Sequence, residues 1–206
     1  MRLFDLGYVC LPVRPGGKYL DCDAMGYDSL HFQTMHKPFV GLLFTAIPFQ
    51  FSQHPPDRET VSRWFREHTG NMALLGGHGG LVILDFDKAG MFERWKAMHP
   101  KLAARVQVER STNGYHVYLR SRTPIIHSPL YLRNRWAGDI LATGRCAVCT
   151  PSVLNNGHRY HWLAGQSPFE AEPAWIDSLE SISIHPSSPW RRFIDPITGA
   201  HSFTPQ

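Results

Sequence analysis

The chain of 206 residues contains no apolar segment long enough to span a bilayer and no leader of the secretory type at its start. Its first residues include a charge at Asp5 and lack a continuous apolar stretch. Cysteine is scarce, and of the four residues only Cys146 and Cys149, in "CAVC", are close in sequence. These features argue against a membrane protein and a disulfide framework, so we expect a cytoplasmic protein with reduced thiols.

A strong charge imbalance and repeated segments are also missing. Lys and Arg number 21 against 17 Asp and Glu, which gives a net charge of +4 with neutral histidines. This mild excess permits an acidic partner such as nucleic acid but does not require one. Hydrophobic residues make up 43% and charged residues 18% of the chain, which is ordinary for a globular protein with a real core.

The first half of the sequence mixes strand and helix patterns. Strands are bounded by glycine and proline, whereas helices show apolar residues at helical spacing after a capping residue. The predicted elements are strands at Gly7–Val13 and Asn71–Gly77, a helix capped by Asp57 that ends near Thr69, a helix at Ala89–Pro100, and an apolar strand or buried segment at Phe39–Ile47.

The second half alternates apolar and polar residues, as antiparallel strands do. "RVQVER" and "YHVYLR", separated by "STNG", predict a β-hairpin. Two further strands, "GDILAT" and "CAVCTPSV", are predicted around a turn near Gly144 and Arg145, then a hairpin turn and strand in "NNGHRYHWL" and a short helix at Trp175–Leu179. We expect an α+β fold with an α/β first lobe and a mostly antiparallel second lobe around a cleft.

Two carboxylates end the apolar run in "GLVILDFDKAG". If the strand continues through Asp87, then Asp85 and Asp87 point to the same side, because side chains alternate along a strand. Such like charges repel, and a divalent cation would remove the conflict. The alternative is that Asp87 lies in a loop and caps the following helix. These residues alone favour neither interpretation.

Two more candidates lie at predicted strand edges. His116 opens the second arm of the hairpin, and Asp139 begins a strand in "WAGDILATG". Three carboxylates on adjacent strands could hold two divalent metals for an in-line displacement, and carboxylate oxygens suit Mg²⁺ or Mn²⁺. The plainer interpretation makes His116 a core or surface histidine and Asp139 a turn residue.

Three segments, taken together, are specific: "NMALLGG…GGLVILDFD", "STNGYHVYLR" and "GDILATG…CTPSVLNNGHRYHW". In order and spacing they resemble the bifunctional DNA primase/polymerase (Prim-Pol) domain of the archaeo-eukaryotic primases, found in plasmid, phage and integrated-element replication proteins. The resemblance implies a single catalytic domain over residues 1–186, followed by a C-terminal tail over residues 187–206. It also implies an RRM-like second lobe, with the active site in the cleft between the lobes.

The resemblance further implies a template-directed nucleotidyltransferase that synthesises or extends primers on single-stranded DNA. Its substrates would be ribo- or deoxynucleoside triphosphates, and a replicative helicase is an expected partner. The implied residues are Asp85, Asp87 and Asp139 for two Mg²⁺ or Mn²⁺ ions, His116 for the incoming phosphates, and Ser111, Asn113, Gly114 and Ser152 for the nucleotide. The alternative function is an inactive module that binds single-stranded nucleic acid.

Some features depart from the family pattern or suggest other sites. Tyr115 replaces the usual small residue before the histidine and is expected to narrow the pocket, and Lys18 follows the family's Gly-Gly but not its usual continuation. Cys146 and Cys149 would lie on opposite faces of a strand, so no structural zinc is expected. The clusters "RNRW" and "WRRF" suit phosphate contact and base stacking, with solvated surface as the alternative.

Overall fold

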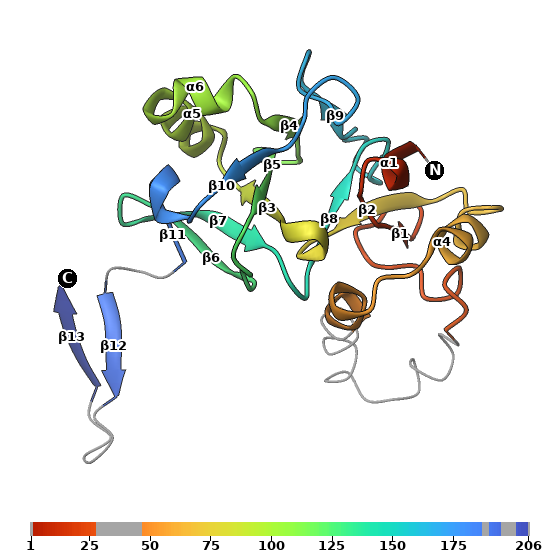
Figure 1. The fold of residues 1–206 in the computed structure, drawn as a ribbon, viewed down its shortest axis with the longest axis horizontal. Coiled ribbons are helices and arrows are strands. Elements are labelled where there is room, and N and C mark those ends of the chain that lie inside the picture. The colour runs from red at the N-terminus through yellow and green to blue at the C-terminus, as the bar shows by residue number, and fades with distance from the viewer. Residues whose placement is uncertain (1, 28–46, 187–189, 195–200, 206) are drawn as a thin grey trace.

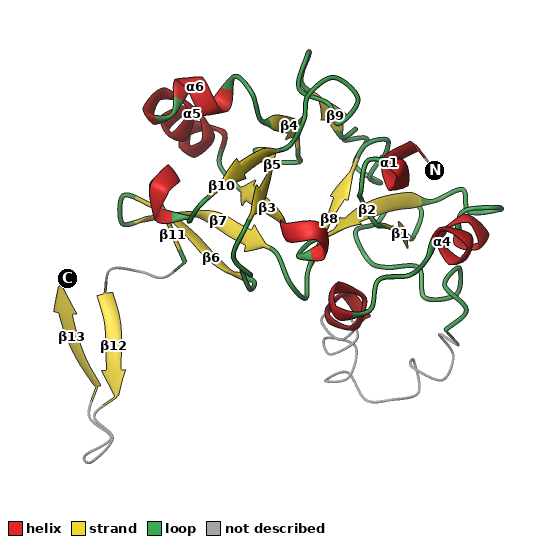
Figure 2. Ribbon diagram, in the orientation of Figure 1, coloured by secondary structure: helices red, strands yellow, loops and turns green. Residues whose placement is uncertain are grey.

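A computed structural model describes residues 2–27, 47–186, 190–194 and 201–205. Helices accompany sheets whose strands are mostly antiparallel (Figure 1, Figure 2), which confirms the α+β class. The elements are α1 (Arg2–Asp5), β1 (Cys10–Val13), α4 (Arg58–Trp64), β2 (Asn71–Leu75), η1 (His78–Gly80), β3 (Leu81–Phe86), α5 (Ala89–Met98), α6 (Pro100–Ala103), β4 (Gln107–Arg110), β5 (Tyr115–Ser121), β6 (Ser128–Leu132), β7 (Arg135–Leu141), β8 (Cys146–Cys149), β9 (His161–Trp162), β10 (Ala174–Ile176), η2 (Glu180–Ile182), β11 (Ile184–His185), β12 (Trp190–Ile194) and β13 (His201–Pro205). A further helix covers residues 47–53.

Strand β2 lies at the centre of a three-stranded antiparallel sheet, between β1 and β8. Ala73, in the middle of β2, is opposite Leu11 on one side and Val148 on the other. The sheet and helix α4 share one hydrophobic core, to which α4 contributes Val61 and Trp64. The strands predicted before and after the helix that Asp57 caps, now β1 and β2, are therefore confirmed.

Helix α4 begins as predicted and ends earlier than predicted. The Asp57 carboxylate caps the helix by accepting a hydrogen bond of 2.8 Å from the Thr60 backbone N–H. The helix ends at Trp64, and the chain then turns so that the His68 ring lies 2.9 Å from the Asn71 carbonyl oxygen. This contact with the start of β2 requires a loop where the sequence predicts a further helical turn.

The larger sheet has eight strands, in the order β11-β6-β7-β3-β5-β4-β9, with β10 pairing in parallel with β5. Strands β4 and β5 form the antiparallel hairpin that the sequence predicts. Strands β7 and β8, predicted around a turn near Gly144 and Arg145, are both present but belong to different sheets. The connection between them therefore joins the two sheets (Figure 1).

The short helix predicted at Trp175–Leu179 is wrong. Ala174 and Ile176 are buried while Trp175 is 51% exposed, which is the alternation of a strand. This strand, β10, pairs with the end of β5 from Leu119 onward, beyond the part of β5 that β4 occupies. The unpaired edge of β5 provides the hydrogen-bonding partner that a local sequence pattern does not reveal.

The side chains of strand β3 divide between two cores. Val82, Leu84 and Phe86 belong to the core beneath helix α5. Leu81 and Ile83 belong to the core that the larger sheet shares with the three-stranded sheet. Because successive side chains alternate, the next position on this second face is the first aspartate of the sequence motif.

The C-terminal strands β12 and β13 pair with each other, and among the described residues no other strand pairs with them. They follow the domain boundary expected at residue 186, which stays a prediction. The apolar segment predicted at Phe39–Ile47 lies almost entirely outside the described residues. Within the described ranges, no helix has both the length and the apolar character needed to cross a membrane.

Candidate active site

Asp85 lies at the centre of three adjacent strands. In the pairing of β3 with β7 it is opposite Asp139, and in the pairing of β3 with β5 it is opposite His116. Directly opposed residues of an antiparallel pair share a face, so these side chains lie side by side toward the three-stranded sheet. The sequence predicts that Asp139 begins a strand, but the structure places it in the interior of β7. The register therefore brings together three residues that are far apart in the sequence.

Asp87 follows directly after β3, and its backbone N–H donates a 3.0 Å hydrogen bond to the Ala137 carbonyl in β7. The residue in the cap position of helix α5 is Lys88, and no side chain caps this helix. The interpretation of Asp87 as a helix cap is therefore wrong. Asp87 does lie in the loop after β3, as that alternative expected, because the strand ends at Phe86. A role of Asp87 beside Asp85 stays a prediction.

Two glycines allow the neighbouring strands to approach the end of β3. A Cβ atom at Gly114 would lie 1.7 Å from the Phe86 carbonyl oxygen, and one at Gly138 would lie 1.8 Å from the Asp85 carbonyl oxygen. Gly138 also has a φ of +147°, which L residues rarely adopt. Both positions thus require glycine if β5 and β7 are to flank the carboxylates this closely.

The neighbouring carboxylates raise the pKa of Asp87. Burial raises the pKa of Asp87, and the negative charges of Asp85 and Asp139 raise it further. Lys18 and His116 act in the opposite direction. Lys18, whose role the sequence left open, therefore lies close enough for its charge to act on the site. An aspartate whose pKa is raised by neighbouring carboxylates lies in an environment in which a cation is stabilised.

His116 is buried and lies between two carboxylates. Its Nε2 atom is 3.4 Å from Asp85 Oδ1, and its Nδ1 atom is 3.2 Å from Glu109 Oε2. Burial by itself lowers the pKa of His116, but the contacts with Asp85 and Glu109 outweigh it and raise the pKa to about 9. At neutral pH the ring is therefore a cation, able to donate a hydrogen bond from each nitrogen.

Glu109 is the residue of this site that sequence analysis missed. It lies opposite His116 in the pairing of β4 with β5, with an exposed fraction of 0%. The sequence does contain a signal for such a site. In "RVQVER", Gln107 and Glu109 alternate with valines, and in a strand buried on both faces these two positions would normally be apolar. Within the predicted hairpin these positions share a face with His116.

The donor atoms suit a hard divalent cation, since Asp85, Asp87 and Asp139 supply only carboxylate oxygens. Their ligand atoms do not converge: in the described part of the chain, no three His, Cys, Asp or Glu side chains form a group able to hold a metal ion. The shared face and the donor chemistry fit Mg²⁺ or Mn²⁺. Convergence of the three side chains would accompany binding, because a cation removes their mutual repulsion.

The residues expected at the nucleotide occupy different environments. In the hairpin turn, Asn113 is exposed, while Ser111 is buried and its N–H donates to the Gly114 carbonyl at 3.1 Å. Ser152 is 1% exposed, and its hydroxyl bonds both the N–H and the carbonyl of Met72 in β2. This hydroxyl thus holds its segment against the three-stranded sheet, and a contact with nucleotide stays a prediction for all four residues.

Tyr115 does not narrow the site, contrary to the expectation from the sequence. Its ring centroid lies 4.2 Å from that of Phe92 in helix α5, on the face of the larger sheet opposite to His116. The Arg110 guanidinium lies over the ring at 4.7 Å and donates to the Gly114 carbonyl. The alternation of side chains along β5 explains the result, because residues 115 and 116 must point to opposite faces.

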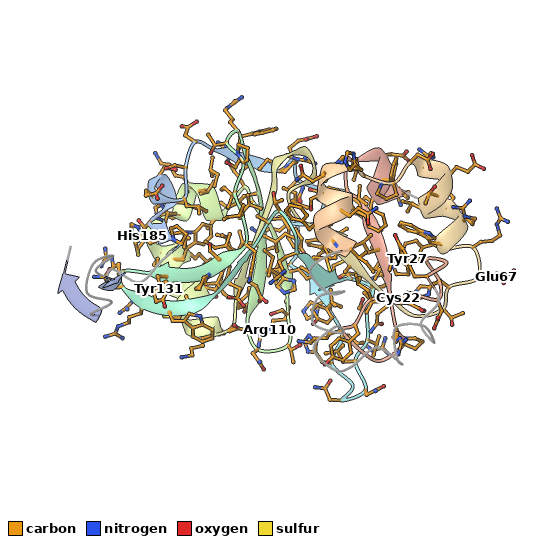
Figure 3. The ribbon with its side chains drawn as sticks, turned by 90° about the horizontal axis from the view of Figure 1, so that it is seen from below. Cys22, Tyr27, Glu67, Arg110, Tyr131 and His185 are labelled. Carbon is orange, nitrogen blue, oxygen red and sulfur yellow. The ribbon has the colours of Figure 1, made fainter. Side chains whose placement is uncertain are left out.

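Basic and aromatic side chains continue beyond the carboxylates. Lys88 Nζ lies 5.4 Å from the ring centroid of Trp136, which is 43% exposed. Trp136 belongs to the basic–aromatic cluster "RNRW". The other cluster, "WRRF" at Trp190–Phe193, lies in β12, whose side chains are outside what the structure describes. Figure 3 shows Arg110 between two groups of labelled residues: Tyr131 and His185, in strands of the larger sheet, on one side, and Cys22, Tyr27 and Glu67, in the segments that follow β1 and α4, on the other.

The cysteine pair of "CAVC" lies in β8, within the three-stranded sheet. Burial raises the pKa of Cys146 to about 12, and the pKa of Cys149 is also raised by burial. Both side chains are free thiols. Their environment is therefore that of structural thiols and not of reactive thiolates.

Comparison with known proteins gives one finding at the level of the family. A family model described as "Bifunctional DNA primase/polymerase, N-terminal" matches residues 2–175. The match covers most of the chain and includes the three aspartates, His116 and the residues expected at the nucleotide, but not the cluster Trp190–Phe193. No curated protein sequence matches.

Proposed function

Because this chain belongs to the Prim-Pol family of bifunctional DNA primase/polymerases, we propose that it is a template-directed nucleotidyltransferase. It would synthesise or extend primers on single-stranded DNA, with nucleoside triphosphates as substrates. The enzyme class follows from the family. The substrates, the metal-dependent mechanism and a replicative helicase partner belong to the proposal.

The observation that carries the proposal is the register around Asp85. Asp139 on one side and His116 on the other share its face of the sheet, and Asp87 follows two residues later. An acidic group beside a protonated, buried imidazole provides negative ligands for metal and a positive donor for phosphate oxygens. These are the complementary requirements of a metal–triphosphate complex.

Each residue has a proposed role. Asp85, Asp87 and Asp139 would hold two Mg²⁺ or Mn²⁺ ions, which supply alignment of the attacking 3′-hydroxyl and charge neutralisation of the departing pyrophosphate. His116 would donate from Nε2 to the phosphates of the incoming nucleotide. The hairpin turn with Ser111, Asn113 and Gly114 would lie beside the triphosphate, as would the segment at Ser152.

The finer architecture also belongs to this proposal. The three-stranded sheet and the larger sheet would act as two lobes, the larger one RRM-like, with substrate between them. Support comes from the orientation of the carboxylates, which occupy the face of β3 that shares its core with the three-stranded sheet. A nucleotide bound there would contact both sheets.

A primer-extension assay with Mn²⁺ or Mg²⁺ tests the proposal. Wild type should incorporate nucleotide on a single-stranded template, and the double variant Asp85→Ala with Asp87→Ala should not. Asp177→Ala, at an exposed aspartate that follows β10, is the matched control and should behave as wild type. Equal incorporation by wild type and the double variant would refute the proposal.

The alternative function, an inactive module that binds single-stranded nucleic acid, makes different predictions. Such a module would bind single-stranded nucleic acid but would have no affinity for metal or nucleotide. Calorimetry with Mn²⁺, with dATP plus Mn²⁺, and with a short single-stranded oligonucleotide separates the two functions. Heat from the oligonucleotide alone would favour the alternative.

A further inference from the structure

Glu109 is a carboxylate with no access to solvent, since its exposed fraction is 0%. Removing a carboxylate from water costs several kcal/mol unless hydrogen bonds and positive charge compensate for it. Both of its oxygens are used. Oε2 accepts a hydrogen bond from the Tyr118 hydroxyl at 2.8 Å and lies 3.2 Å from His116 Nδ1, while Oε1 accepts from the N–H and the hydroxyl of Thr150.

These partners come from both sheets. His116 and Tyr118 lie in β5 of the larger sheet, whereas Thr150 directly follows β8 of the three-stranded sheet. Two residues after Thr150 comes Ser152, which is bonded to β2. Glu109 therefore joins the sheet that carries the aspartates to the segment expected to border the nucleotide.

The contact with Glu109 also fixes the imidazole ring. When Nδ1–H of a histidine has a carboxylate acceptor, both the ring orientation and the proton on Nδ1 are set, and Nε2 faces the opposite direction. Here Nε2 lies 3.4 Å from Asp85, so the ring spans from Glu109 to the carboxylate group. The Tyr160 ring, with its centroid 5.9 Å away, packs near the imidazole.

We propose that Glu109 is a positioning residue for nucleotide binding. It holds the His116 ring with Nε2 directed toward the carboxylates and the incoming triphosphate, and it anchors the segment after β8 beside that ring. The role assigned to the triphosphate rests on the function proposed above. The ring-positioning role stands on the geometry of Glu109 and His116.

A matched control lies two residues earlier in the same strand. Gln107 is also 0% exposed and faces the same side of β4. Its side chain bonds the Tyr8 hydroxyl and the Ala171 carbonyl, and it has no contact with His116. Replacing Gln107 thus disturbs a buried polar network of the same strand without touching the imidazole.

The first test is steady-state extension of a primed template with dATP as the varied substrate. Glu109→Gln should raise KM for dATP by about 10-fold to 100-fold, by analogy with the loss of affinity or activity when the partner that orients a metal-ligating histidine is removed. The kcat should change much less. The control Gln107→Leu should lower the amount of folded enzyme and leave KM for dATP unchanged. Equal KM values for Glu109→Gln and wild type would overturn the proposal.

The second test does not require activity. In protein labelled with ¹⁵N-histidine, long-range ¹H–¹⁵N spectra at one pH report which ring nitrogens carry protons, and His116→Gln identifies the relevant signals. Glu109→Gln should shift the His116 signals, while Gln107→Leu should not. If wild type incorporates no nucleotide, the proposed function fails, and this spectrum still decides whether Glu109 positions the ring. Unchanged His116 signals in Glu109→Gln would refute the role of Glu109 in positioning the ring.

Discussion

The two faces of strand β3 differ in chemistry at its C-terminal end. Toward helix α5, Val82, Leu84 and Phe86 are at most 2% exposed, and the Phe86 ring lies 5.9 Å from that of Phe92. Toward the three-stranded sheet, the buried Leu81 and Ile83 are followed by Asp85, whose side chain is 25% exposed. The apolar face stabilises the position of the strand, and the acidic face places repelling carboxylates where a bound cation would be stabilised. Stability and function are thus separated by the alternation of a single strand.

The largest expected effect comes from the acidic face. Asp85→Asn should lower kcat/KM for nucleotide incorporation by about a thousandfold, since loss of several kcal/mol of charge stabilisation in the transition state corresponds to about three decades in rate. Its free energy of unfolding should stay within about 1 kcal/mol of wild type, because weaker repulsion offsets a weaker contact with His116. Urea unfolding and extension kinetics check both values. A destabilised but active variant would contradict the separation of the two faces.

The apolar face should respond in the opposite way. Phe86→Ala removes a fully buried ring from the core beneath α5 and should lower the free energy of unfolding by about 3–5 kcal/mol. The remaining folded protein should keep most of its activity per molecule. Urea unfolding combined with extension rates corrected for the folded fraction measures this. Loss of activity greater than the loss of folded protein would show that the two faces are coupled.

His116 makes the stability of the acidic face depend on pH. Its folded-state pKa of about 9 exceeds the ordinary value of 6.5, so the protonated ring stabilises the folded state fully below pH 6.5. This contribution is lost as the pH rises through about 9. Urea unfolding between about pH 6 and pH 10, with a metal chelator present, should show this decline.

His116→Gln is the control for the pH experiment, since other buried groups also titrate at high pH. The decline in stability should be smaller in this variant than in wild type across the same range. The same pH dependence in both proteins would show that His116 is not protonated in the folded state.

The smallest effect is expected at Tyr115. Tyr115→Phe keeps the ring that packs on Phe92, and the ring lies on the face of the sheet opposite to His116. Values of kcat and KM for nucleotide should therefore stay within about twofold of wild type, as for a substitution without contact to the site. A clear gain in activity would indicate that the hydroxyl does restrict the pocket.

Local patterns were sufficient to predict the strands that carry the site. The apolar run before Asp85, the hairpin around His116 and the glycine before Asp139 each mark a strand, and the family pattern connects them. What the sequence did not provide is register. Only the pairing of β3 with both β5 and β7 shows that these three residues are direct neighbours.

The features that sequence analysis missed depend on distant contacts. Strand β10 forms because β5 has an unpaired edge, and the residues around Trp175 do not reveal that edge. Glu109 gains its importance from Thr150, which approaches it from the other sheet. The position of Tyr115, by contrast, follows from local alternation alone, because neighbouring residues of β5 point to opposite faces of the sheet.

The close packing that Gly114 and Gly138 permit also decides which parts of the site can move. Asp85 is held from both sides by hydrogen-bonded strands, so its amide should be among the slowest in the protein to exchange with deuterium. The strand backbone around Asp85 should therefore stay in place when a ligand binds, while the carboxylate side chains rearrange.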